Sequence, residues 1–451
     1  MRIIIVGVGK IGLTLAKTIS AEGHDVVLVD KDESAIKTAH NTLDVIGITG
    51  NGATAPILES AGAARADILI ATASTDELNI LICLLAKKMG VQQTIARIRD
   101  PEYARDVYRM SADLGLSMIL NPELLAAGEI TRALKYPSAI KIENFARGKV
   151  SLVEFRIEDN NPLKGKKIMD IGGLLPVRVL VCAIVRGENV IIPRGNDTIE
   201  AGDIIYVTAS KKQLYTFFKS VKSNTASLKN ILILGCGKIG YYLAEELLDA
   251  GASVKIIEHD RERCNFIAGA LPKTTVIYGD GTDHVLLSEE GIESMEGVVS
   301  LTGIDEENII ISLYAKSKKV DKVITKITRE TLLGTVDNLG LESIVTPARI
   351  VADRVLGYIR ALQASGDGSI ITMYKLVEDK VEAIEFEVNE MPDLTGIPIM
   401  KRRLKKNLLI ACVIRKNEII FPSGSDTIEP KDRIIVVTAN RSLNNLSDIL
   451  A

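Results

Sequence analysis

The sequence repeats itself once along its length, and this duplication constrains the fold more than any other feature. Three segments of the first half return in the second half, in the same order and at an offset of 228 or 229 residues: Arg2–Gly12 as Asn230–Gly240, Thr75–Asn79 as Ile304–Asn308, and Gly195–Glu200 as Gly424–Glu429. The acid Asp30 likewise returns as Glu258. One unit present twice therefore explains nearly the whole chain of 451 residues.

Each copy opens with a glycine-rich turn between a strand pattern and a helix pattern. In the first copy an apolar, β-branched run at 3–6 precedes the turn, and the apolar spacing at 13–19 fits a helix. Gly7 permits a tight turn, Gly9 lets backbone approach a pyrophosphate, and Gly12 lets the helix pack on the strand. Because a helix N-terminus presents N–H groups and a positive dipole end, the pattern predicts nucleotide binding.

The rest of the first 135 residues alternates between strand and helix patterns, which is typical of a doubly wound, Rossmann-like parallel sheet. Strands are predicted at 2–6, 25–29, 44–48, 67–72 and 94–98, with a sixth near 117–120. Helices are predicted at 11–21, 32–40, 54–61, 76–89 and 101–112, with another that ends near 134.

The pattern then changes to that of a small β-rich module with a helix or two. Strand patterns occupy 150–157, 179–192 and 204–208, and a Gly/Asn/Asp turn interrupts them at 195–197. The small polar residues at 222–228 read as a linker. We therefore expect four α/β or α+β domains, at 1–135, 136–221, 229–360 and 361–451.

Composition excludes several classes of protein. A net charge of −3, 4% aromatic residues and no Trp argue against binding to nucleic acid. No apolar run approaches the roughly 18 residues needed to span a bilayer. The five cysteines lack C-x-x-C spacing, which argues against zinc and against a disulfide framework. We expect a cytoplasmic setting.

Charged residues in and near the glycine turn are the first candidate ligand contacts. Lys10 and its repeat Lys238 are either phosphate contacts or solvated turn residues. Asp30 and Glu258, which end the second strand of each copy, can accept hydrogen bonds from ribose hydroxyls and would repel a 2′-phosphate. The pattern therefore favours NAD(H), ATP or ADP over NADP.

The ends of the later strands supply further candidates. Asn51 and Asp280 could reach an adenine edge or could simply belong to glycine turns. Small residues after the fourth strand, Ala73 and Thr302, would leave room for a nucleotide across the sheet. Ser74 and Glu77 also fit a helix-capping box, which is a structural role. At the fifth strand end, Arg97 in the first copy and Lys326 in the second are either phosphate-side charges or solvated.

No catalytic constellation accompanies the two turns. The four histidines do not repeat between the copies and are expected at the surface or in turns: His24, His40, His259 and His284. No nucleophile elbow, Walker sequence or H-E-x-x-H pattern occurs. The sequence therefore predicts a chain that binds nucleotides twice and transforms none of them.

With these features, the chain resembles the TrkA family of potassium-uptake regulators. The resemblance rests on two glycine turns, Gly7–Gly12 and Gly235–Gly240, each followed by a small β-rich module, and on two further stretches, 96–103 and Gly195–Glu200 with its repeat. It implies tandem RCK domains, each with a nucleotide-binding part and a C-terminal ligand-sensing part. It also implies a cytoplasmic gating ring, typically of four chains, beneath a TrkH-type potassium-translocating membrane subunit, with NAD(H) and ATP or ADP as ligands.

The resemblance also implies a set of nucleotide contacts by position. In the first copy they are Gly7, Val8, Gly9, Lys10, Ile11, Asp30, Asn51, Ala73 and Arg97, and in the second copy Gly235, Cys236, Gly237, Lys238, Ile239, Glu258, Asp280, Thr302 and Lys326. Two positions depart from the pattern: many members have Asp where Asn51 stands, and Lys326 stands opposite Arg97. Which nucleotide each half prefers therefore stays open.

The leading hypothesis is a non-enzymatic regulatory subunit of a potassium transporter. The alternative is an NAD-dependent oxidoreductase with a duplicated dinucleotide-binding fold, which the missing acid/base group disfavours. A redox-sensing transcription regulator is a third interpretation, disfavoured by the near-neutral charge and the lack of a helix-turn-helix pattern. The dense basic run at 401–406 receives no function.

Overall fold

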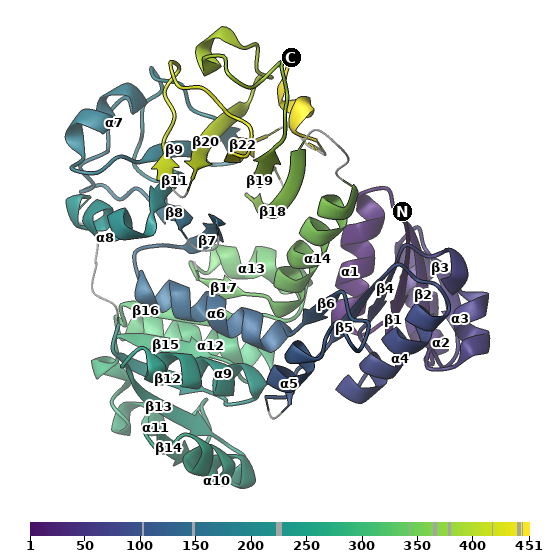
Figure 1. Ribbon diagram of the computed structural model, residues 1–451. Coiled ribbons are helices and arrows are strands. Elements are labelled where there is room, and N and C mark those ends of the chain that lie inside the picture. The colour runs from purple at the N-terminus through teal and green to yellow at the C-terminus, as the bar shows by residue number, and fades with distance from the viewer. Residues whose placement is uncertain are drawn as a thin grey trace. The chain divides into compact units, whose positions relative to one another are not determined.

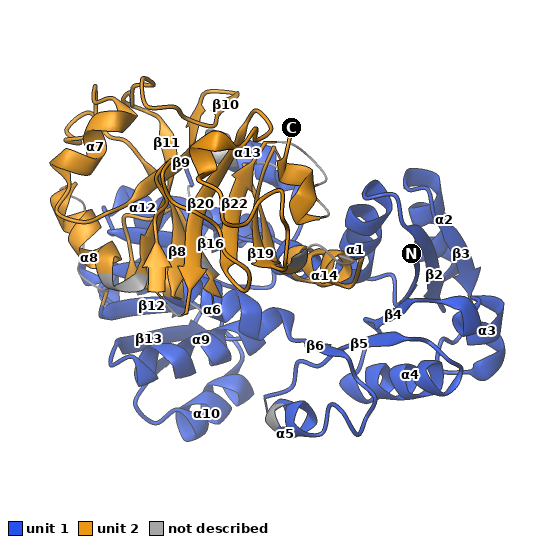
Figure 2. Ribbon diagram, turned by 45° about the horizontal axis from the view of Figure 1, so that its top comes forward, with its two compact units in different colours: residues 1–131, 229–352 blue, residues 132–228, 353–451 orange. Residues whose placement is uncertain are grey.

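The computed structural model describes residues 1–101, 103–146, 149–221, 228–341, 343–363, 368–377, 380–416, 418–439, 443 and 445–451 (Figure 1). These residues form two compact units, coloured separately in Figure 2. Unit 1 comprises residues 1–131 and 229–352, and unit 2 comprises residues 132–228 and 353–451. Each unit thus takes one part from each copy of the repeat.

The first copy contributes a six-stranded sheet to unit 1, in the order β3-β2-β1-β4-β5-β6, and every strand pair is parallel. Its elements are β1 (Arg2–Val6), α1 (Lys10–Ala21), β2 (Asp25–Asp30), α2 (Glu33–Thr42), β3 (Ile46–Thr49), α3 (Ala55–Ser60), η1 (Ala63–Arg65), β4 (Ile68–Ala71), α4 (Asp76–Lys88), β5 (Gln93–Arg97), α5 (Ala104–Arg109), β6 (Met118–Leu120) and α6 (Pro122–Lys135). This confirms the predicted doubly wound sheet.

The second copy contributes an equivalent parallel sheet, in the order β14-β13-β12-β15-β16-β17. Its elements are β12 (Asn230–Leu234), α9 (Lys238–Asp249), β13 (Ser253–Glu258), α10 (Arg261–Ala270), β14 (Thr275–Tyr278), α11 (His284–Glu289), η3 (Ile292–Ser294), β15 (Gly297–Ser300), α12 (Asp305–Ser317), β16 (Lys322–Lys326), η4 (Glu330–Leu332), α13 (Leu333–Asn338), β17 (Ile344–Val345) and α14 (Pro347–Gln363).

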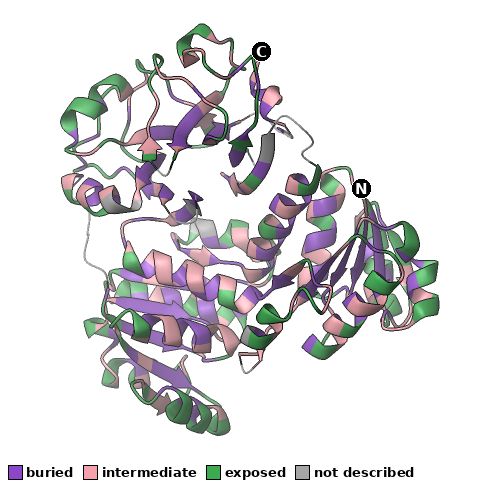
Figure 3. Ribbon diagram, viewed as in Figure 1, coloured by how far each residue is buried: buried purple, intermediate pink, exposed green. Residues whose placement is uncertain are grey.

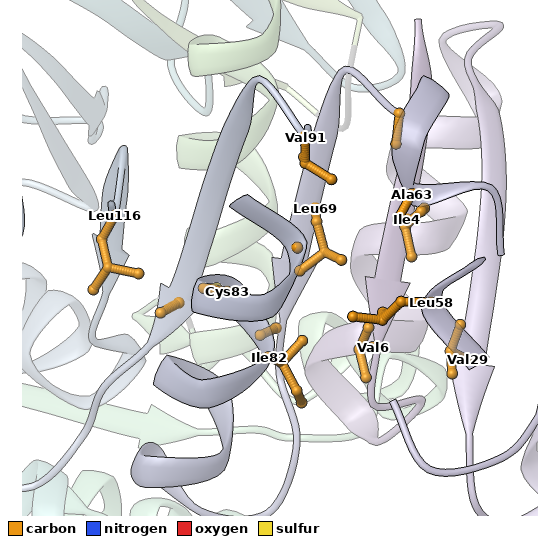
Figure 4. Close-up of a cluster of buried hydrophobic side chains, with 14 of the residues drawn as sticks. Ile4, Val6, Val29, Leu58, Ala63, Leu69, Ile82, Cys83, Val91 and Leu116 are labelled. Carbon is orange, nitrogen blue, oxygen red and sulfur yellow. The ribbon is translucent and has the colours of Figure 1, made fainter. Parts of the chain in front are cut away.

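The central strands of these sheets are buried on both faces (Figure 3). In the first sheet Ile4 and Val6 face Leu58 of α3 and Ile82 of α4, in the apolar cluster of Figure 4. The alternate residue Ile5 is also 0% exposed, because the opposite face is covered too. Continuous β-branched runs such as 3–6 are what such doubly covered strands require.

Unit 2 holds two five-stranded antiparallel sheets, ordered β10-β9-β11-β8-β7 and β18-β19-β22-β20-β21. The first has β7 (Lys141–Phe145), β8 (Val150–Arg156), α7 (Ile168–Leu174), β9 (Leu180–Arg186), β10 (Asn189–Ile191), β11 (Ile204–Ser210) and α8 (Lys211–Ser220). The second has β18 (Gly368–Leu376), β19 (Val381–Val388), η5 (Ile399–Lys401), β20 (Leu408–Arg415), β21 (Glu418–Ile420), β22 (Arg433–Thr438) and η6 (Leu446–Ile449).

The two antiparallel sheets share a core. Phe145 and Tyr206 of the first copy lie in one apolar cluster with Val381 and Ile435 of the second. A further contact joins the copies, because the Ala146 N–H donates to Glu385 Oε2 at 3.0 Å. The small α+β modules that the sequence predicts are confirmed, although the strand β7 was not predicted.

Three local expectations have different outcomes. The helix predicted at 101–112 is shorter in the described residues, at Ala104–Arg109. The capping box of Ser74 and Glu77 is wrong, because α4 is capped by Thr75, whose hydroxyl accepts from the Leu78 N–H at 3.3 Å. The linker at 222–228 lies outside the described residues except for Leu228. The four-domain division stays a prediction.

Candidate functional site

The first glycine turn joins β1 to α1 at the carboxyl edge of the first parallel sheet, between β2 and β4. Gly7 has φ +98°, and a Cβ there would lie 2.6 Å from the Thr72 carbonyl oxygen. A Cβ at Gly12 would lie 1.9 Å from the Gly7 carbonyl oxygen, so α1 packs against the turn only with glycine at this position. In an open sheet of this order, ligands bind beside the point where the strand order reverses.

Neither the backbone conformation nor the packing requires glycine at position 9. Its φ of −73° and ψ of −171° suit any residue, and a Cβ there would meet nothing within 4 Å. The equivalent Gly237 is equally open. A bound phosphate needs open space in front of the N-terminus of a helix and backbone N–H groups that no side chain covers. The turn before α1 offers both, so it fits a nucleotide.

Asp30 stands beside this turn at the end of β2. Its Oδ2 accepts from the Val8 N–H at 2.6 Å, and its Oδ1 accepts from the Asp32 N–H at 2.9 Å. The residue is partly exposed, so lone pairs stay available to ribose hydroxyls. These hydrogen bonds hold the backbone of the turn and the predicted ribose acid together.

The equivalent Glu258 is more enclosed, with a side chain 6% exposed. Its Oε2 accepts from the Cys236 N–H at 2.7 Å, and its Oε1 accepts from the Asp260 N–H at 3.0 Å. His259 Nδ1 lies 2.9 Å from Glu258 Oε1, a contact that the sequence did not suggest. The His259 ring is itself 85% exposed, as expected for a surface histidine.

Asn51 and Asp280 each close a local turn. The Ala53 N–H donates to Asn51 Oδ1 at 3.2 Å, and both the N–H and the hydroxyl of Thr282 donate to Asp280 Oδ1 at 2.8 Å. The hydrogen bond from the Thr282 backbone lowers the pKa of Asp280. These contacts support the interpretation of both residues as turn residues.

The cations at the fifth strand end are held against the fourth. An Arg97 Nη donates to the Ala73 carbonyl oxygen at 2.9 Å, and Lys326 Nζ donates to that of Thr302 at 2.6 Å. Burial lowers the pKa of both Arg97 and Lys326. Both residues are partly buried beside the sheet edge, so the solvated alternative does not describe them.

The sequence reasoning missed two pairs of residues that build this edge. Asn79, 0% exposed, accepts from the Ala73 N–H at 2.7 Å and donates to the Arg97 carbonyl at 2.8 Å, so it joins the ends of β4 and β5. Asn308 does the same for Thr302 and Lys326.

The second pair, Asp76 and its repeat Asp305, anchors the segment that follows the fifth strand of each copy. Asp76 accepts from the N–H groups of Arg99 and Asp100 after β5. Asp305 accepts from those of Thr328 and Arg329 after β16. The signal was present in the repeated stretch Thr75–Asn79.

The second glycine turn also contacts the first copy. Lys238 Nζ lies 2.8 Å from Asp100 Oδ2, and the Tyr242 hydroxyl of α9 donates to the Arg99 carbonyl at 3.0 Å. In the other direction, Lys17 and Thr14 of α1 contact Glu330 of η4. Within unit 1, each glycine-turn helix thus meets the segment that follows the fifth strand of the other copy.

The described residues contain no His/Cys/Asp/Glu group that could hold a metal ion. All five cysteines are free and buried, and burial raises the pKa of the Cys236 thiol to about 12. Among the helices the structure describes, none combines the length and apolarity needed to cross a membrane.

Family models and known proteins match this chain over most of its length. The model described as the TrkA-N domain matches residues 3–120 and again 231–347, and that of the TrkA-C domain matches 152–222. The chain is 37% identical over 445 residues to Trk system potassium uptake protein TrkA homolog 1 of Methanosarcina mazei, which covers 97% of each. It is 31% identical to the TrkA homolog of Archaeoglobus fulgidus, over 100% of both chains.

Two solved structures share the fold. The GsuK channel bound to NAD has a TM-score of 0.65 and 17% identity, over 97% of this chain and 76% of the channel chain. The RCK domain of GsuK has a TM-score of 0.63 and 16% identity, over 97% of this chain and 92% of the other. At these identities the likeness concerns the fold.

Proposed function

The chain belongs to the TrkA family of Trk system potassium uptake proteins, and from that premise we propose that it is a nucleotide-binding regulatory subunit which gates a potassium-translocating membrane protein. One observation carries the nucleotide part of this proposal. Both copies present an open glycine, Gly9 or Gly237, at the head of a helix beside a strand-end acid. The relatives are potassium uptake proteins, so the oxidoreductase alternative is not retained.

NAD(H) is the primary ligand of the proposal, with ATP and ADP as further candidates. The backbone N–H groups at the head of α1 would bind the phosphates, with Lys10 as a counter-charge. Asp30 would bind the ribose hydroxyls, and Arg97 would add positive charge at the neighbouring strand end. A bound nucleotide would add charge and new contacts at the sheet edge. Whether the site is occupied, rather than any reaction of the nucleotide, would then regulate the transporter.

The partner in this proposal is a TrkH-type membrane subunit, and the assembly is a ring of four chains at the inner face of the membrane. A ligand shifts such a ring between two states only by its difference in affinity for them. Each glycine-turn helix contacts the other copy of the repeat, through Lys238 and Asp100 or through Lys17 and Glu330. A ligand bound at the turn would therefore have different affinities for two states in which these contacts differ.

Replacing Asp30 by Ala tests the first site. We expect nucleotide affinity at this site to fall about 10- to 100-fold, because two charge-assisted hydrogen bonds to ribose are lost. Nucleotide-dependent potassium flux should weaken in parallel. Calorimetric titration of the purified chain measures the first effect, and flux in vesicles with the membrane subunit measures the second.

The matched control is Asp25→Ala, which removes an exposed carboxylate from the opposite end of β2 and should change neither quantity. If Asp30→Ala abolishes binding while the response of flux to nucleotide stays normal, the first turn is not the sensor.

A further inference from the structure

The lysine of the second glycine turn is already paired with an acid of the first copy. Lys238 Nζ lies 2.8 Å from Asp100 Oδ2, and the two side chains are 34% and 32% exposed. Lys238 is the first residue of α9, so its backbone belongs to the turn of the helix whose free N–H groups would bind phosphate. Asp100 therefore borders the phosphate end of the second site.

The lysine of the first glycine turn is not paired in this way. Its Lys10 is exposed and forms no ion pair with the residues that the structure describes. The repeat places Arg329 where Asp100 stands in the first copy, an offset of 229. The acid that does face α1, Glu330, contacts Thr14 and Lys17, one and two turns beyond Lys10.

A second carboxyl group, that of Glu123, lies among Lys238 and two arginines of the first copy. Glu123 of α6 has its Oε1 3.7 Å from an Arg99 Nη, while its Oε2 is buried without a hydrogen-bond partner among the described residues. Burial raises the pKa of Glu123 and so favours its neutral form, whereas Arg99, Arg97 and Lys238 favour its ionised form. At the matching place in the second copy, where α14 begins as α6 does with a proline, the residue after that proline is Ala348.

We propose that Asp100 is a specificity-determining residue of the second nucleotide site and makes that site discriminate against a third phosphate. The inference rests on the proposed function, since it assumes that the second turn binds nucleotides. A phosphate that contacts Lys238 must lie within roughly 6–8 Å of the Asp100 carboxylate. At that separation, near a protein surface, each added phosphate charge weakens binding about tenfold.

Stability does not explain the Asp100–Lys238 pair. Ion pairs that are a third exposed contribute little to folding. The segment around Asp100 is held instead through its backbone, because the Asp100 N–H donates to Asp76 Oδ2 at 2.9 Å. Asp100→Asn keeps this hydrogen bond and removes only the charge, so the variant should fold.

The test compares ATP with ADP on the full chain. Asp30→Ala serves as the background, so that the tighter binding seen by calorimetry reports the second site, with NAD, ATP and ADP each titrated without divalent cation. We expect ADP to bind about five- to tenfold more tightly than ATP, and Asp100→Asn to bring this ratio close to one. The control is Asp106→Asn, which removes an equal charge from α5, where Asp106 pairs with Arg109, and should leave the ratio unchanged.

Salt supplies a second measurement. At about 0.5 M salt the preference of the background protein for ADP over ATP should shrink towards one, because salt screens the charge of Asp100. Asp100→Asn lacks this charge, so its preference should change little. Asp100→Ser repeats the comparison should Asp100→Asn unfold. If ADP binds but both variants leave the ratio unaltered, the role of Asp100 is overturned and the proposed function stands. If the second site binds none of the three nucleotides while the first site of the parent chain does, only the role of Asp100 is overturned, and if neither site binds them, the proposed function is overturned as well.

Discussion

Replacing Gly12 by Ala is expected to destabilise the protein by about 2–4 kcal/mol, whereas Gly9→Ala should leave its stability within about 1 kcal/mol of the parent. The Cβ that Gly12→Ala adds would overlap the Gly7 carbonyl oxygen, 1.9 Å away, so α1 must move off the turn. At Gly9 the methyl group would meet nothing within 4 Å. Thermal unfolding followed by circular dichroism measures the difference.

Gly9→Ala, which should hardly change stability, is expected to have a large effect on ligand binding. Gly9→Ala places a methyl group where a phosphate must approach the backbone, so nucleotide affinity at the first turn should fall about 10- to 100-fold in a fully folded protein. Gly240→Ala is the matched control for stability. Its Cβ would lie 3.0 Å from the Gly235 carbonyl oxygen, and a small shift relieves that contact. Should Gly9→Ala bind nucleotide normally, the open space at this turn has another purpose.

The second large effect is expected in unit 2, where Glu385→Ala should cost about 3–5 kcal/mol of stability. Glu385 is 0% exposed, pairs with Arg433 and accepts from the Ala146 N–H at 3.0 Å. Truncation leaves a cation and a buried N–H without their acceptor. The midpoint of thermal unfolding should fall by about 6–15 °C.

Glu387, two residues along β19, is exposed and provides the comparison. Glu387→Ala should change the midpoint by less than about 2 °C, because surface substitutions seldom exceed about 0.5 kcal/mol. Glu385→Gln keeps the shape and one acceptor and should fall between the two. Equal midpoints for Glu385→Ala and Glu387→Ala would mean that the buried Glu385 carboxylate, which joins the two antiparallel sheets through Ala146, adds nothing to stability.

Much of the fold could be predicted because it depends on local patterns. Apolar runs such as 3–6 and 68–71 predict buried parallel strands from their neighbours in sequence alone. The strand β7 at Lys141–Phe145 escaped prediction, because its mixed polar pattern becomes a strand only by pairing with β8. Tertiary pairing overrides weak local preference in such segments.

The same division applies to the candidate site. The turn, its helix and the acid Asp30 follow in order within 30 residues, so the sequence predicts them as a group. Asn79 could have been singled out from the repeated stretch, but its role depends on the ends of β4 and β5, which only the sheet brings together. The contact of His259 with Glu258 likewise depends on side-chain orientation.

The sequence by itself determined that this chain carries two copies of one glycine-turn unit of strand, turn and helix, because glycine positions and strand-end acids restrict the backbone locally. Only the tertiary structure decided that the two copies differ in electrostatic environment. Lys238 and Asp100 are 138 residues apart, and nothing in either local pattern links them. Packing of one copy against the other brings an acid to the second turn, while Lys10 of the first turn forms no ion pair with the described residues.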